Sequence, residues 1–275
     1  MSIPKLRSSG PFIFVLLTAF IGGCQTTSKG PQAQSTPKPP AGAPAIREIV
    51  ADLKGADDAL KNFRAAVTFT LESPKLKAVQ RFTSGSIAFR RPGDLYIVGR
   101  NKLNVTLFKL TSQGPKFLIE FPTVQNTDER YYYSFEGEQF AKVPFSVAPA
   151  DVVREMFAPV TWDNAAVQSA RITAFDKDSG TADIDLPLAD GLRRSLRVQG
   201  APWVIVHSTL HAQDGAVLAD TSMSGYGEFG GVRLPANVEA NFPGEQTRLV
   251  FEMRNIQVNT NLPDSMFAIT WRPGQ

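Results

Sequence analysis

The residues most able to carry out acid–base or metal chemistry lie in two short segments of the second half of the chain. His207 and His211 occur in WVIVHSTLH and are the only histidines. On a strand, a spacing of four places both on one face but about 13 Å apart, too far to share one zinc ion. Asp183 and Asp185, in TADIDL, also share one strand face. Paired carboxylates can do acid–base work, but solvated strand positions are the favoured interpretation of all four residues.

The sequence lacks several short motifs that mark common catalytic sites. It has no GxSxG, no P-loop and no HExxH, and we expect no GxGxxG after a strand. We therefore predict a protein that is not an enzyme, with no metal and no cofactor. The formal net charge is only +3, and no basic run is longer than Arg90-Arg91 or Arg193-Arg194. Nucleic-acid binding needs a basic face, so we expect no nucleic-acid partner.

Cys24, the only cysteine, follows a segment typical of secretion signals. Lys5 and Arg7 give a cationic start, and Pro11–Ile21 (PFIFVLLTAFI) carries no charge. That apolar stretch suits a signal peptide and is too short for a membrane-spanning helix, which needs about 20 apolar residues. A disulfide is excluded because a second cysteine is missing from the chain.

The quartet Ile21-Gly22-Gly23-Cys24 resembles the bacterial lipobox. The resemblance implies cleavage between Gly23 and Cys24 and acylation of Cys24, with an ordinary signal peptide as the alternative. We therefore predict a signal peptide over residues 1–23 and a lipidated Cys24 on a disordered, proline-rich tether over residues 24–45. A random coil of this length reaches about 25 Å. Gln25 is not the Asp that favours inner-membrane retention in Gram-negative lipoproteins, so the resemblance implies the periplasmic face of the outer membrane.

Residues 46–275 are predicted to form one mainly β domain. The apolar spacing predicts a helix over 46–63, weakened by Gly55, and a short helix over 149–157. Elsewhere apolar and polar residues alternate, as in 67–71, 86–90, 102–107 and 248–254, which predicts strands with one dry face. Because two helices cannot cover such a sheet from outside, we predict a half-open, curled antiparallel sheet, an unclosed barrel, with the helices plugging its concave face.

Three segments carry a resemblance to the superfamily of periplasmic lipoprotein carriers and outer-membrane lipoprotein receptors, LolA and LolB. GSIAFRRPGDLYI (85–97) is similar to a strand and Arg-Pro turn of the carrier. VPFSVAPADVVREMFAP (143–159) and LPANVEANFPGEQTRLVFEMRNIQVN (234–259) are similar to an inner helical segment and the closing strands of the receptor. The resemblance runs loosely from Ile46 to Ile269. The receptor's protruding, membrane-inserting apolar loop has only a weak counterpart in Val124.

The resemblance implies an apolar cavity that takes lipoprotein acyl chains beneath a lid of helices. In the carrier, the Arg of the Arg-Pro pair holds this lid shut by hydrogen bonding, so Arg91 is the expected latch, with an ordinary turn residue as the alternative. We expect the cavity to be lined by eight apolar residues: Phe69, Ile87, Phe89, Leu107, Trp203, Phe251, Met253 and Phe267.

Three functions remain open from the sequence. The favoured one is an anchored protein that binds acyl chains or lipoproteins and serves their localisation at the outer membrane. The second is a structural or docking envelope lipoprotein, whose barrel is filled by its own side chains and whose outer face binds other envelope proteins. The third is an enzyme acting on lipid or glycan, which the missing motifs disfavour.

Overall fold

A computed structural model describes residues 39–74, 79–114, 116–135, 152, 155–156, 162, 164–188 and 191–270. The predicted cleavage site at Gly23 and the lipidation site at Cys24 lie outside these residues, as does most of the predicted helix over 149–157. Residues Pro39–Gln275 form one compact unit. Within its described part, no helix has the length and apolar character needed to cross a membrane.

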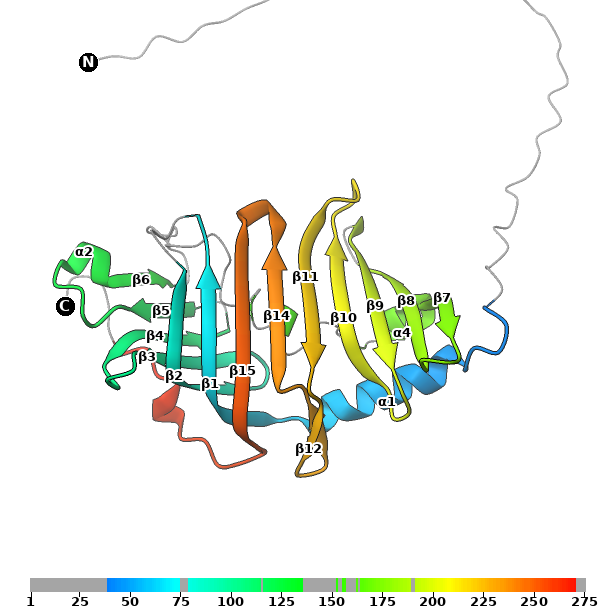
Figure 1. The fold of residues 1–275 in the computed structure, drawn as a ribbon, viewed down its shortest axis with the longest axis horizontal. Helices are drawn as coiled ribbons and strands as arrows, with labels where there is room; N and C mark the ends of the chain where they lie inside the picture. The colour runs from blue at the N-terminus through cyan, green and yellow to red at the C-terminus, as the bar shows by residue number, and fades with distance from the viewer. Residues whose placement is uncertain are drawn as a thin grey trace, which may run out of the picture. The chain divides into compact units, whose positions relative to one another are not determined.

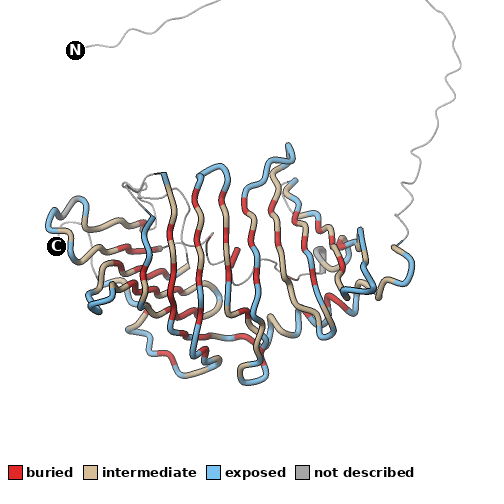
Figure 2. Tube along the Cα trace, in the orientation of Figure 1, coloured by how far each residue is buried: buried red, intermediate tan, exposed pale blue. Residues whose placement is uncertain are grey.

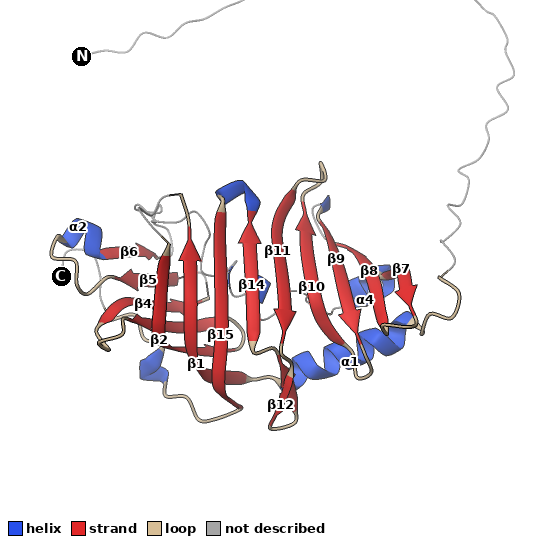
Figure 3. Ribbon diagram, viewed as in Figure 1, coloured by secondary structure: helices blue, strands red, loops and turns tan. Residues whose placement is uncertain are grey.

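Strands dominate the described residues (Figure 3), and all but two of them join one antiparallel sheet. The spatial order is β6-β5-β4-β3-β2-β1-β15-β14-β11-β10-β9-β8-β7, while β12 and β13 pair separately. The strands are β1 (Asn62–Glu72), β2 (Gln80–Arg90), β3 (Asp94–Arg100), β4 (Thr106–Gln113), β5 (Lys116–Glu120), β6 (Tyr131–Ser134), β7 (Arg171–Asp176), β8 (Thr181–Pro187), β9 (Arg193–Gln199), β10 (Val204–His211), β11 (Val217–Ser224), β12 (Gly227–Phe229), β13 (Val232–Leu234), β14 (Asn237–Phe242) and β15 (Thr247–Val258).

The two ends of the sheet, β6 and β7, are not joined, so the sheet does not close into a barrel. The predicted mainly β, unclosed antiparallel sheet with few helices is thereby confirmed. The helices are α1 (Ile46–Ala59), α2 (Thr127–Arg130) and α4 (Asn164–Ser169), with short 3₁₀ turns η2 (Pro243–Glu245) and η3 (Asp264–Met266). Val152, Glu155 and Met156 are also helical, within the segment where the second helix was predicted.

The sheet bends where β2 meets β3, and β3–β6 run across the direction of β1 and β15 (Figure 1). Two paired glycines lie at this bend, Gly85 on β2 and Gly99 on β3. A Cβ on Gly99 would lie 2.5 Å from the ring of Phe82, and one on Gly85 would lie 2.5 Å from the carbonyl oxygen of Val98. Glycine in a strand permits such close approach, so the sequence allows the sheet to fold over itself here.

Alternating burial along the strands (Figure 2) places one large hydrophobic cluster on the concave face. Phe69 on β1, Phe89 on β2 and Phe251 on β15 belong to it, as their predicted phases require. The predicted phase of 102–107 was wrong, because β4 starts at Thr106 and buries Phe108 and Leu110 instead. A register shift between Gly99 and Arg100 accompanies this change, and a one-residue slip exchanges the two faces of a strand.

Helix α1 covers the part of the concave face that is formed by β8 and β9. It ends at Ala59, earlier than the predicted Phe63, and passes through Gly55 without interruption. Its buried residues Ile49, Val50 and Leu53 pack in a second hydrophobic cluster with inward residues of β8 and β9. In Figure 1, α1 runs beneath the ends of β9 and β10. The helix therefore forms a cover over one part of the curved sheet.

Candidate functional site

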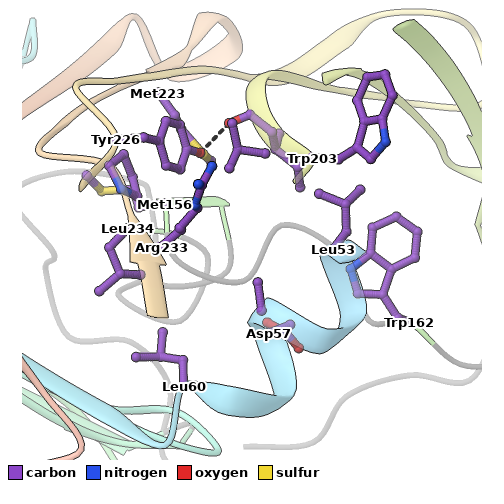
Figure 4. A pocket seen from close by; sticks show the side chains of 14 residues that line it. Leu53, Asp57, Leu60, Met156, Trp162, Trp203, Met223, Tyr226, Arg233 and Leu234 are labelled. Carbon is purple, nitrogen blue, oxygen red and sulfur yellow. Dashed lines mark hydrogen bonds between the residues drawn. The ribbon is translucent and has the colours of Figure 1, made fainter. Parts of the chain in front are cut away.

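A cavity of about 100 Å³ lies between α1 and the sheet (Figure 4). Apolar and aromatic side chains make up most of its wall, with Asp57 and Arg233 as its charged residues. The lining residues are Leu53, Ala56, Asp57, Leu60, Met156, Trp162, Trp203, Val204, Ile205, Met223, Tyr226, Arg233, Leu234 and Pro235. We call this the α1 cavity.

Tyr226 lines the α1 cavity, and its hydroxyl group is held by a hydrogen bond to the backbone. Its hydroxyl donates to the backbone carbonyl of Ile205 and lies 3.5 Å from the Sδ atom of Met223. Burial raises the pKa of the Tyr226 phenol far above its ordinary value of 10.0, because the phenolate would lose its hydration. The phenol therefore stays protonated and tethers the segment after β11 to β10.

A second cavity of about 40 Å³ lies in the large cluster and is lined almost wholly by apolar residues. Phe69, Phe108 and Phe251 contribute to its wall, together with Val152 from the helical segment. The Phe69 ring stacks on Phe82 at 4.3 Å and on Phe251 at 5.4 Å between ring centroids. These rings pack directly beside the second cavity.

The structure brings most, but not all, of the eight predicted cavity residues together. Phe69 and Phe251 line the second cavity, Trp203 lines the α1 cavity, and Leu107 packs half-buried against the large cluster. Three more belong to that cluster: Ile87, Phe89 and Met253.

Phe267 lies apart from these residues. It packs with Ala88 and Leu262 in a separate small cluster, and the Arg90 guanidinium lies 4.6 Å from its ring centroid. Ala88 alternates with the inward Ile87 and Phe89, so Phe267 covers the opposite face of the sheet.

Arg91, the predicted latch, contacts the end of α1. Its Nε–H donates to the backbone carbonyl of Leu60 at 2.8 Å, and its Nη2 pairs with the Asp57 carboxylate. Burial raises the pKa of Asp57 above its ordinary value, with the Arg91 charge opposing that shift. A second contact attaches the helix, because the Trp203 backbone N–H donates to Asp52 at 3.3 Å. Arg91 and Trp203 therefore join α1 to the sheet at two separate places.

A buried ion pair is the feature that the sequence interpretation missed. Arg194 on β9 is 1% exposed and Glu155 is 0% exposed. The two Nη atoms donate to the two Glu155 carboxylate oxygens at 2.6 and 2.9 Å, and Nη1 also donates to Ser208 at 2.8 Å. Alternate residues of β9 face the interior of the sheet. Leu196 and Val198 are two of them, and Arg194 lies on the same face. That alternation is the signal in the sequence that could have identified Arg194.

The histidines and the paired aspartates lie half-exposed on strands. His207 contacts Ser222 and Asp220, with 2.9 Å between Nε2 and the Asp220 carboxylate. Asp183 pairs with Arg197 at 2.8 Å, across neighbouring strands. Among the residues that the structure describes, no three potential metal ligands come together. The cross-strand contacts account for these side chains without catalytic chemistry.

One glycine-rich segment, GYGEFG at 225–230, has the GxGxxG spacing of a dinucleotide-binding loop. It follows β11, so the expectation that no GxGxxG follows a strand was wrong, but it leads into the β12–β13 hairpin. The dinucleotide fingerprint requires a helix at this point, whose N-terminus receives the pyrophosphate. The spacing therefore carries no nucleotide-binding function here.

Known proteins resemble this chain in fold but not in sequence. No family model and no curated protein sequence matches it. A DUF1329 family protein from Desulfovibrio piger is 12% identical with a TM-score of 0.55, and the match covers 82% of this chain and 98% of that one. A LolA superfamily protein from Nitrosomonas europaea is 12% identical with a TM-score of 0.52, covering 82% and 99%. A putative outer membrane lipoprotein-sorting protein domain from Vibrio parahaemolyticus is 10% identical with a TM-score of 0.51, covering 80% and 94%.

At 10–12% identity these similarities show the fold alone. The chain has a LolA-like fold, and the resemblance expected from the sequence is confirmed at that level.

Proposed function

We propose that this protein is a lipid-anchored, non-enzymatic component of the bacterial envelope that binds acyl chains on the concave face of its sheet, beneath α1. Its task is the localisation of lipids or lipoproteins at the outer membrane. The observation that carries the proposal is the cover formed by α1: this amphipathic helix covers part of an apolar concave face and leaves the α1 cavity beneath it. The LolA-like fold supports it.

The described state is closed. Pockets that hold small molecules usually measure about 300–1,000 Å³. The α1 cavity of about 100 Å³ and the second cavity of about 40 Å³ are far smaller. For an acyl chain to enter the α1 cavity, α1 must therefore move away from the sheet.

The free energy gained by burying an acyl chain and the free energy lost by exposing the buried face of α1 are of similar size. A chain of about sixteen carbons gains roughly 12 kcal/mol on burial, at about 0.8 kcal/mol per CH₂. Exposing the buried α1 residues Ile49, Val50 and Leu53 costs about 1.5–3 kcal/mol each. The balance favours binding by a few kcal/mol, which suits a protein that must also release its ligand.

Arg91 is the proposed latch of this cover. Its bonds to Leu60 and Asp57 exist only while the end of α1 stays beside the turn after β2. Opening α1 breaks these bonds and exposes the cavity wall. Arg91 thus sets how readily ligand enters and leaves.

Cys24 and the tether over 24–45 would hold this domain at the membrane. Several acyl chains on one residue make an anchor that is very hard to release. The Leu103 side chain, 83% exposed between β3 and β4, is a candidate for direct membrane contact. The Asn101 side chain holds this loop by accepting from the backbone N–H groups of Leu103 and Val105. Leu103 is therefore a better counterpart than Val124 of the receptor's protruding loop.

Native mass spectrometry of residues 39–275, purified without detergent, tests the proposal. This unit contains all the described clusters and strand pairs. A mass increase that matches a bound acyl lipid, and that is lost on delipidation, supports acyl binding. A chain that carries no lipid and does not take up a fluorescent fatty acid contradicts it.

The small cavities and the stacked rings of Phe69, Phe82 and Phe251 favour a second candidate. This is a docking lipoprotein whose interior is filled by its own side chains and whose outer face binds an envelope protein.

A further inference from the structure

The buried pair of Arg194 and Glu155 lies at the junction of the two hydrophobic clusters. Across the strand pairs, Arg194 is opposite Leu186 of the second cluster on one side and Leu210 of the large cluster on the other. Both charges are thus held in the apolar interior of the curved sheet. Burying two ions costs several kcal/mol per ion, and apolar replacements of such pairs are often neutral or stabilising. Stability by itself therefore does not explain why charged residues occupy these positions.

The groups around this pair have unfilled hydrogen-bonding capacity. A guanidinium has five N–H donors, and among the described residues Arg194 donates through its two Nη atoms to Glu155 and Ser208. Its Nε and the Thr221 hydroxyl oxygen are fully buried and, within the described part of the chain, lack a hydrogen-bond partner. Thr221 lies directly opposite Ser208 in the β10–β11 register. We call Arg194, Ser208 and Thr221 the polar cluster.

The polar cluster adjoins the α1 cavity. Met223, which lines the cavity, lies two residues beyond Thr221 on the same face of β11. Met156, another lining residue, directly follows Glu155. A ligand that enters under α1 therefore has an apolar wall beside it and a buried guanidinium close to that wall.

We propose that Arg194 binds the carboxylate of a single-chain, fatty-acid-type amphiphile, and that the Glu155 carboxylate holds this site while no ligand is bound. The inference rests on the proposed acyl-binding function and names its ligand class. A fatty-acid carboxylate replaces Glu155 with the same two charge-assisted bonds, so Arg194 stays neutralised throughout the exchange. Thr221 offers a further hydroxyl to the incoming group. The alkyl chain then lies along the apolar wall of the α1 cavity.

This exchange discriminates against uncharged headgroups. An alcohol or ester that displaces Glu155 leaves the guanidinium buried without a counter-charge, which is strongly unfavourable. The protein should therefore prefer an acid to a neutral amphiphile of the same chain length. A pair that only fixes the helical segment gives no such preference, because chain burial is the same for both ligands.

Calorimetric titration of residues 39–275 with laurate and with dodecanol tests the inference. The readout is the ratio of the two affinities. In the wild type, laurate should bind about tenfold or more tightly than dodecanol, because laurate keeps a counter-charge on the buried Arg194 when it displaces Glu155 and dodecanol does not. Glu155→Gln removes the competing charge, so it should raise the ratio by about tenfold or more. Arg194→Leu should remove the preference for laurate, with a ratio of one or below because the remaining Glu155 carboxylate repels that of laurate, while dodecanol still binds.

Two controls protect this result from effects on folding. Arg197→Leu removes an arginine of the same strand that pairs with Asp183 in an exposed position, and it should leave the ratio unchanged. The double variant Glu155→Leu/Arg194→Leu removes both buried charges together, so it should fold and bind both probes equally. If the ratio is the same in the wild type, Glu155→Gln and Arg194→Leu, the carboxylate site is wrong while acyl binding stands. If neither probe binds the wild type, the proposed function is wrong, and this inference is wrong with it.

Discussion

Arg91, in the turn after β2, donates its Nε–H to the backbone carbonyl of Leu60, the first residue after α1, at 2.8 Å. The same guanidinium pairs with Asp57 in the last turn of α1. The end of the covering helix is thus fastened to the sheet by a side chain that lies far along the chain from it. Loss of this side chain should change ligand exchange more than it changes the core.

Arg91→Leu should increase the apparent affinity for acyl ligand and slow its release. Closure of α1 competes with ligand binding. The lost bonds contribute about 1.5–3 kcal/mol to closure, so the apparent affinity should rise by about one to two orders of magnitude. Arg91→Lys keeps the charge without the planar fork and should be intermediate. Stopped-flow release of a fluorescent fatty acid measures this. Arg90→Leu is the matched control, because Arg90 pairs with Asp94 and Asp264. Equal release rates for the wild type and both Arg91 variants would make Arg91 an ordinary turn residue.

Phe251→Ala and Phe267→Ala form a test of which face of the sheet binds ligand. Both side chains are almost fully buried, so each truncation should lower the free energy of unfolding by about 3–5 kcal/mol. Urea unfolding measures this cost. Only Phe251→Ala should weaken fatty-acid binding, because Phe267 covers the opposite face with Ala88 and Leu262. Loss of binding in both variants, or in neither, would contradict binding on the concave face.

Tyr226 should make stability fall at alkaline pH. The folded state holds the Tyr226 pKa far above 10.0, whereas in the unfolded chain it returns to about 10. Its contribution is therefore complete below about pH 10 and declines as the pH rises above that value, since the unfolded state then releases the proton more readily. Tyr226→Phe should flatten this decline in urea unfolding between neutral and alkaline pH. An ultraviolet titration in which all five tyrosines ionise together near pH 10 would contradict the assignment.

Leu103→Asp should weaken the association of residues 39–275 with vesicles of phosphatidylethanolamine and phosphatidylglycerol. Burial of a leucine side chain contributes about 1.5–3 kcal/mol, so we expect a loss of about tenfold or more in a sedimentation assay. Leu218→Asp is the matched control, because Leu218 on β11 is also exposed. Equal effects of the two substitutions would show that the loop between β3 and β4 has no special part in membrane contact.

Cys24→Ser in the full-length chain should abolish incorporation of labelled palmitate and remove the protein from the outer-membrane fraction. The hydroxyl cannot be alkylated as the thiol is, so the precursor stays uncut or without lipid. Gel fluorography and membrane fractionation measure both effects. A variant that is still labelled and fractionates like the wild type would exclude the lipobox interpretation.

The sequence by itself determined that the fold is mainly β and which residues form much of the core. Where apolar and polar residues alternate strictly, as around Phe69 and Phe251, a strand with one buried face has only one possible phase, and the structure has that phase. The helical spacing at the start of the domain likewise specified α1 and its buried face. The resemblance of the Arg-Pro turn to that of the carrier suggested Arg91 as a contact of the covering helix, and its latch role stays a prediction.

Other features depended on contacts between distant segments. Leu107 and Phe108 are both apolar, so local alternation could not decide which one faces inward, and pairing with β3 decided it. Phe267 lies beyond the last strand, and its hydrophobicity does not say which face of the sheet it covers. The Arg194–Glu155 pair joins residues 39 positions apart, and each one alone reads as a surface charge. Burial of a charge is decided by whether the fold brings a counter-charge to it, and only the tertiary structure provides that.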